Sequence, residues 1–263
     1  MPILFIARRR KKTMKELIKN NLKYLIFLAF FGLVGGYFTA LYSIQNISQD
    51  LLDEAISQVG SIEVLIIVTT FQSFGYALIL GIIGKMLAKK IGLWRKVIFE
   101  RRANIELILV SVIGGAAFVL LDYFIFSNFS EAVKNMYLEK PTFEYIMESI
   151  TYGGVIEEVM MRLFLMSLLA LIIQKAAKKE KINDKILIIS NAIVALLFAA
   201  GHLPATYTMM APVTPLMIFR CFLLNGGFGL MFGRLYRKYG IHYAILGHAG
   251  VHIVSKLIWI LFI

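Results

Sequence analysis

Long apolar stretches recur along this chain, and short polar or charged segments separate them. Seven stretches are long enough to cross about 30 Å of hydrocarbon as helices. They cover residues 24–44, 64–84, 107–126, 145–173, 186–202, 216–233 and 241–263. Lipid offers no hydrogen-bond partner to backbone groups, so each stretch is predicted to be helical. The pattern therefore predicts an all-α, polytopic membrane helix bundle with about seven, or up to eight, transmembrane helices.

Composition supports a membrane protein. The chain has 263 residues, of which 59% are apolar and only 17% are charged, whereas a typical soluble domain is about 25% charged. These values exclude a water-soluble single domain. No internal repeat, low-complexity tract or linker divides the sequence, so residues 1–263 are expected to form a single integral membrane domain.

The formal net charge of +12 could indicate binding to nucleic acid or to an anionic membrane face. The number of Lys and Arg residues in the connections between spans alternates between high and low with every predicted crossing. The connections on one side hold 23 of these residues, and those on the other side hold 2. The positive-inside rule then places the N-terminus, with its basic run from Arg8 to Lys12, in the cytoplasm. We expect an integral protein of a bacterial plasma membrane, in contact with the lipid bilayer and not with nucleic acid.

Ionisable residues inside the predicted spans are candidates for function, because each costs about 2.5–3.5 kcal/mol to insert. Three predicted spans each contain a single Asp, Glu, Lys or Arg residue: Asp122, Arg220 and Lys256. We interpret each of them as structural, either as part of a buried pair or as a group reaching toward an interface.

The fourth span differs because it carries a cluster. Glu157 and Glu158 are adjacent, and Arg162 lies four residues after Glu158, so Glu158 and Arg162 share a helical face and can form an ion pair. Glu157 points about 100° away from Glu158, which leaves its carboxylate free to face a cavity. A purely structural cluster of charges is the alternative.

Three of the four histidines also lie in predicted spans. His202 ends the fifth span, just before a proline that can unsettle the helix. His248 and His252 are four residues apart, so both rings project from one face of the seventh span. We expect these three rings to share a site with Glu157, whereas His242 is expected at the membrane interface.

The depths of these residues agree only in part. At 1.5 Å per residue, Glu157 and His202 lie about 24 Å from the cytoplasmic ends of their spans. His252 comes out at about 16 Å and His248 at about 10 Å. The seventh span must therefore tilt or begin deeper if the four side chains are to meet.

Three motifs in order, each within a membrane span, resemble a known family. They are Glu157-Glu158-x-x-x-Arg162, Phe198-x-x-x-His202 and His248-x-x-x-His252. The pattern resembles the CAAX protease and bacteriocin-processing family, whose best-described members are the type II CAAX prenyl endopeptidases. The resemblance covers about residues 145–260, which we expect to form the catalytic core.

The resemblance implies an intramembrane glutamic endopeptidase that cleaves membrane-associated peptides or proteins. It implies that Glu157 and His202 activate a water molecule, that His248 and the residue four later stabilise the oxyanion, and that Glu158 and Arg162 orient the site. The family usually has Asn where this chain has His252. A neutral imidazole can still donate one hydrogen bond to an oxyanion.

Other functions remain open at this stage. One Glu and three His form an acceptable zinc ligand set, but the His-Glu-x-x-His spacing of metalloproteases is absent, so we expect no cofactor. A non-catalytic role, as a proton-coupled transporter or a bacteriocin immunity factor, is a further alternative, because buried Glu and His also serve as proton relays. No paired halves with matching interrupted helices indicate a transporter.

Overall fold

The computed structural model describes the backbone of residues 14–263 and the side chains of residues 21–263. The basic run from Arg8 to Lys12 lies outside these residues. Every regular element in the described part of the chain is a helix, and the predicted all-α membrane bundle is confirmed. Six stretches of these described residues are helical, long and apolar enough to cross a membrane: Asn21–Asn46, Ile62–Lys90, Arg101–Asn128, Asp184–Met209, Pro215–Tyr239 and Ile241–Phe262.

These six stretches coincide with six of the seven predicted spans, and short helices join or extend them. The helices outside the fourth predicted span are α1 (Met14–Asn46), α2 (Gln49–Val59), α3 (Ile62–Lys90), α4 (Arg101–Phe124), η1 (Phe126–Asn128), α5 (Glu131–Met136), α8 (Asp184–Gly201), α9 (Leu203–Met209), α10 (Pro215–Cys221), η4 (Phe222–Gly226), α11 (Gly227–Tyr239) and α12 (Ile241–Phe262).

The fourth predicted span is a composite helix. It consists of α6 (Phe143–Glu148), η2 (Ser149–Glu157), η3 (Val159–Met166) and α7 (Ser167–Ala176), which follow one another with Glu158 between η2 and η3. Residues of η2 and η3 are π-helical, with i→i+5 hydrogen bonds and a wider turn than an α-helix. Counting this composite helix as a crossing brings the total to the predicted seven.

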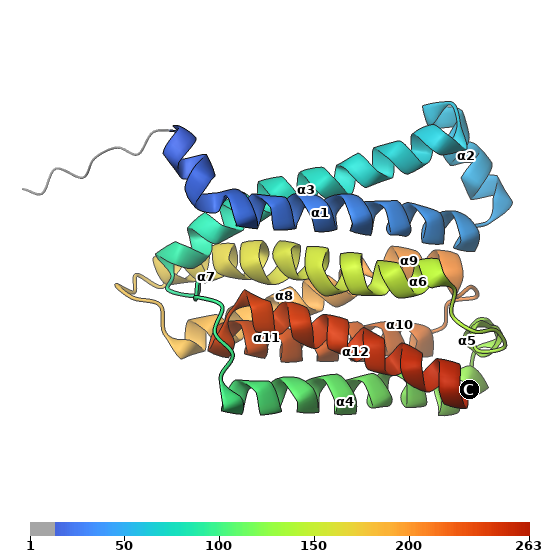
Figure 1. The fold of residues 1–263 in the computed structure, drawn as a ribbon. Coiled ribbons are helices and arrows are strands. Elements are labelled where there is room, and N and C mark those ends of the chain that lie inside the picture. The colour runs from blue at the N-terminus through green and yellow to red at the C-terminus, as the bar shows by residue number, and fades with distance from the viewer. Residues whose placement is uncertain (1–13) are drawn as a thin grey trace, which may run out of the picture.

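The composite helix lies in the middle of the bundle (Figure 1). On one side it packs against α1 and α3, which also pack against each other. On the other side η2 contacts α12 and η3 contacts α8, while α4 lies at the far edge against α12. The elements that carry the three motifs are therefore neighbours in space, although Glu157 and His202 are 45 residues apart in sequence and His202 and His248 are 46 apart.

The bundle buries small and apolar residues at its centre and exposes large apolar residues at its outer faces. Ile156 and Leu163 of the composite helix are at most 1% exposed, whereas Phe71 on α3 and Ile113 on α4 are 59% and 61% exposed. A soluble protein rarely exposes so many large apolar side chains together. This distribution is the one expected when lipid surrounds the bundle.

A close approach between η2 and α12 brings the first and third motifs together. A Cβ atom at Gly154 would lie 2.8 Å from the Cβ atom of Ala249. Only glycine allows these two backbones to come so near. Gly154 is three residues before Glu157, and Ala249 directly follows His248, so this contact sets the distance between the carboxylates and the histidines.

Candidate active site

Each candidate side chain is placed by a local feature of its helix. Glu157 ends the π-helical segment η2, and Glu158 joins that segment to η3. His202 follows the last residue of α8, where Pro204 opens the next short helix and lacks the backbone donor that would continue α8. His248 and His252 lie one turn apart on α12. The predicted helix break beside His202 is confirmed.

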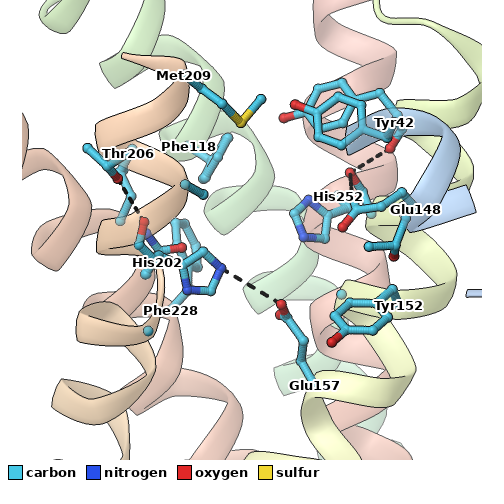
Figure 2. A pocket seen from close by; sticks show the side chains of 18 of the residues that line it. Tyr42, Phe118, Glu148, Tyr152, Glu157, His202, Thr206, Met209, Phe228 and His252 are labelled. Atoms are coloured by element: carbon cyan, nitrogen blue, oxygen red, sulfur yellow. Dashed lines mark hydrogen bonds and ion pairs between the residues drawn. The ribbon is translucent and has the colours of Figure 1, made fainter. Parts of the chain in front are cut away.

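The structure brings the Glu157 carboxylate between two histidines. Its Oε1 atom is 3.8 Å from Nε2 of His202, and its Oε2 atom is 4.0 Å from Nε2 of His248. Figure 2 shows the Glu157 and His202 side chains pointing toward one another across the cavity. These separations are too long for direct hydrogen bonds and leave room for the polar groups to share a water molecule.

The backbone fixes the orientation of the His202 ring. Its Nδ1 atom is 2.9 Å from the carbonyl oxygen of Phe198, which can only accept a hydrogen bond. Nδ1 therefore carries a hydrogen, and Nε2 of the neutral ring is left to accept a proton on the side of Glu157. The Phe198 ring packs edge-on against the same imidazole at 4.6 Å, so this motif residue holds His202 in two ways.

Glu158 and Arg162 form the predicted ion pair. Nη1 of Arg162 is 3.1 Å from Oε1 of Glu158, and both side chains have no exposed area. Arg162 Nη2 also donates to the carbonyl oxygen of Gly229 at 3.0 Å. The same Glu158 oxygen lies 2.9 Å from Nδ1 of His248. The pair thus fixes the composite helix against α11 and orients the His248 ring.

His252 joins the cluster through His248. The Nε2 atoms of the two rings are 3.1 Å apart, and the rings stack with their centroids 4.9 Å apart. The predicted mismatch in depth is therefore resolved in favour of one shared site.

A cavity of about 500 Å³ opens onto this cluster. Glu157, His202, His248 and His252 line it, whereas Glu158 and Arg162 lie behind its wall. The wall also contains residues from α1, α4 and the segments around α9 and α10, among them Thr39, Tyr42, Asn46, Phe118, Thr206 and Met209. Its volume lies within the range typical of small-molecule pockets, about 300–1,000 Å³.

Sequence reasoning missed two parts of this site. Glu148, at the edge of the fourth span, lines the cavity on the same side as His252 (Figure 2). Gly153 leaves room beside the reactive groups, since a Cβ atom there would lie 3.3 Å from Nε2 of His252 and 3.9 Å from Oε2 of Glu157. The available signal was a further carboxylate within the fourth predicted span, but α-helical spacing would place it on the opposite face from Glu157.

The other ionisable residues in the spans have partners. Asp122 and Arg220 form a buried ion pair, as the structural interpretation predicted. Lys256 is 3% exposed, and its Nζ atom lies 3.4 Å from Nδ1 of His252. Lys256 is thus attached to the candidate site. His242 lies at the start of α12, away from the cavity, with Nε2 3.4 Å from the carbonyl oxygen of Ile98.

Among residues 21–263, no group of three or more His, Cys, Asp and Glu side chains has a geometry that could hold a metal ion. Nδ1 of His248 and Nδ1 of His202 already contact protein acceptors. Without rearrangement, only the Nε2 atoms of these two rings face the carboxylate of Glu157.

These features define a membrane helix bundle with a buried Glu/His cavity. The sequence model of the family described as type II CAAX prenyl endopeptidase Rce1-like matches residues 141–254. The match confirms the resemblance predicted from the three motifs, and it contains all six residues of the predicted site. It supports an integral membrane enzyme of the protease type that acts on a peptide substrate in the membrane. Comparisons with curated proteins and with solved structures each give no match.

Proposed function

We propose that this protein is an intramembrane endopeptidase of the glutamic type, in which Glu157 and His202 activate a water molecule. The observation that carries the proposal is the placement of the Glu157 carboxylate, on the wall of the cavity, 3.8 Å from Nε2 of His202 and 4.0 Å from Nε2 of His248. A carboxylate and an imidazole in this relation are the groups that general acid–base hydrolysis requires.

In this mechanism, a water molecule between Glu157 and His202 loses a proton to Glu157 as its oxygen attacks the peptide carbonyl carbon. The carbonyl π electrons move to oxygen, and the resulting oxyanion accepts a hydrogen bond from His252, whose ring is held in place by its contact with His248. The C–N bond then breaks, and the proton held by Glu157 passes to the leaving amine. His202 accepts a hydrogen bond from the attacking water through Nε2 and so orients it.

Glu158 and Arg162 serve this mechanism from behind the cavity wall. Their ion pair holds the composite helix, and the bond from Nδ1 of His248 to Glu158 fixes that ring. Neither group reaches the cavity, so neither is placed to contact substrate. We assign them as positioning residues.

The test is cleavage of a peptide library by purified protein in detergent or in liposomes. Wild type should cleave a subset of peptides, and Glu157→Gln should not, because the amide cannot take the proton. Glu131→Gln is the matched control, since the side chain of Glu131 is 79% exposed. Cleavage by Glu157→Gln near the wild-type rate would contradict the mechanism, and a wild type that cleaves no peptide would favour the non-catalytic alternatives.

We also propose that the N-terminus lies in the cytoplasm of a bacterial cell. The asymmetry of 23 basic residues against 2 supports this orientation. With seven crossings, the C-terminus lies on the opposite side of the plasma membrane. A reporter fused to the C-terminus should then be active only outside the cytoplasm, and a reporter active only in the cytoplasm would contradict the seven-span topology.

A further inference from the structure

Lys256 extends the histidine pair by one further turn of α12. Lys256, His252 and His248 are spaced four residues apart on one face of this helix. Nζ of Lys256 lies 3.4 Å from Nδ1 of His252, and Nε2 of His252 lies 3.1 Å from Nε2 of His248. The chain of contacts continues from Nδ1 of His248 to Oε1 of Glu158 at 2.9 Å.

The two ends of this chain determine where its hydrogens lie. An ammonium group can only donate, so Nδ1 of His252 accepts from Lys256 and carries no hydrogen. The hydrogen of a neutral His252 ring is then on Nε2 and points to Nε2 of His248. A carboxylate can only accept, so Nδ1 of His248 donates to Glu158 and its Nε2 accepts from His252. Every contact in the chain is satisfied by this single arrangement.

Lys256 is buried in a setting that favours a fixed position. It is 3% exposed, and its Nζ atom lies 4.0 Å from the centre of the Tyr145 ring. The acidic groups whose charge acts on it are Glu148, the last residue of α6, and Asp122 of α4. A buried lysine of this kind is costly, and packing alone does not require one.

We propose that Lys256 is a positioning residue that makes His252 a hydrogen-bond donor toward the cavity. An asparagine side chain always presents an N–H group, whereas a neutral imidazole carries its single hydrogen on either of two nitrogens. Lys256 selects the form with the hydrogen on Nε2, and this hydrogen transfers its bond from His248 to the oxyanion when substrate binds. The proposal rests on the proposed peptidase function for its catalytic consequence.

The first test reads the tautomer and does not depend on cleavage. Protein labelled with ¹⁵N-histidine is compared with His252→Asn to assign the two ring signals of His252. The wild type should show a protonated Nε2 and an unprotonated, hydrogen-bonded Nδ1. In Lys256→Met, the Nδ1 signal should move to that of a free or protonated nitrogen, and Lys256→Arg should restore it. A wild-type His252 protonated on Nδ1, or signals unchanged in Lys256→Met, would overturn the proposal.

The second test is a double-mutant cycle of cleavage rates, interpreted once the wild type is shown to cleave a peptide. Lys256→Met should lower kcat by about tenfold or more in the wild-type background, which is about 1.4 kcal/mol. It should have little effect in the His252→Asn background, because asparagine needs no tautomer selection. Equal losses in both backgrounds would assign Lys256 to packing and overturn the proposal.

Two further variants keep these tests interpretable. Lys256→Met can fail to fold, because it leaves Glu148 without the nearby positive charge. In that case the double variant Glu148→Gln/Lys256→Met, which removes both charges, takes the place of Lys256→Met in the NMR comparison. Lys140→Met is the matched control for removing a lysine, because Lys140 is exposed and its Nζ atom contacts the carbonyl oxygen of Trp259 outside the histidine chain. The Lys140 variant should leave the His252 signals in place.

Discussion

The bundle holds two sets of ionisable residues in its interior, and they are held in different ways. Nε and Nη2 of Arg220 donate to the two carboxylate oxygens of Asp122 at 2.5 Å each, and the Tyr137 hydroxyl adds a third bond at 3.2 Å. In contrast, the Glu157 carboxylate has its nearest histidine nitrogens at 3.8 and 4.0 Å. The residues of the first set hydrogen-bond to one another, whereas the second set leaves the Glu157 carboxylate open to the cavity.

This difference separates a stabilising pair from a candidate reactive group. A bidentate arginine–carboxylate pair directs both carboxylate oxygens to a protein donor and mainly holds helices together. A carboxylate that is only 18% exposed yet makes no hydrogen bond to residues 21–263 can bind water and exchange protons. A buried charge therefore does not by itself indicate a candidate site. The distinguishing feature is a buried carboxylate without a hydrogen-bond donor among the described residues.

The largest expected effect is on peptide cleavage, and it comes from a variant of a residue beside the Glu157 carboxylate. His202→Ala should lower the cleavage rate by about 10²–10⁴-fold, because the water loses its orienting base. The unfolding midpoint should change much less, since the hydrogen bond of the ring, from Nδ1 to the Phe198 carbonyl oxygen, lies within one turn of chain and joins no second helix. His242→Ala is the control, because that ring lies outside the cavity. Near-normal cleavage by His202→Ala would remove His202 from the mechanism.

The next largest effect is on stability, in the ion pair behind the cavity. Arg162→Ala should destabilise the protein by roughly 3–5 kcal/mol, because it leaves the buried Glu158 charge without its partner. Denaturant unfolding in detergent, or the yield of folded protein, measures this loss. A fully stable but inactive Arg162→Ala would instead indicate that the arginine takes part in the chemistry.

The ion pair of Asp122 and Arg220 should tolerate replacement of both residues together. Asp122→Leu/Arg220→Met should change stability by only about 1 kcal/mol, because removing both partners leaves no unpaired charge. Asp122→Asn alone should be far more damaging, since Arg220 then keeps its charge without a full counterion. If the double variant folds well and still cleaves peptide, the pair is structural; loss of cleavage in well-folded protein would assign it to the site.

The smallest effect is expected at the residue that departs from the family pattern. His252→Asn should keep cleavage within about tenfold, or ~1.4 kcal/mol, because the amide supplies an equivalent donor. We expect activity to survive a strong chelator, with no stoichiometric metal in the preparation. Metal near one equivalent, lost together with activity in His252→Asn, would favour the zinc-dependent alternative, since catalytic zinc depends on its full ligand set.

Sequence periodicity predicted the parts of this structure that depend on local spacing. The separation of four residues placed Glu158 against Arg162, and the same separation placed His248 against His252. Apolar stretches located the spans because lipid forces each one into a helix. These rules act within one segment of chain and need no knowledge of its neighbours.

Features that depend on contacts between segments were not predictable in this way. The π-helical turns of η2 and η3 change the rise and the direction of the side chains, and they form where the composite helix packs against α12 and α3. The contact between Lys256 and His252 was also missed, although it has the same separation of four residues as His248 and His252. Lys256 was interpreted as structural, either as part of a buried pair or as a group reaching toward an interface.

Two parts of the chain form the wall of the cavity, one inside the region that matches the family and one outside it. The proposed reacting groups come from residues 141–254, which match the family, whereas Thr39, Tyr42 and Asn46 of α1 line the cavity from outside that region. Selection can therefore act on α1 and on the reactive helices separately. Divergence in α1 would reshape the cavity while the proposed reacting groups stay constant.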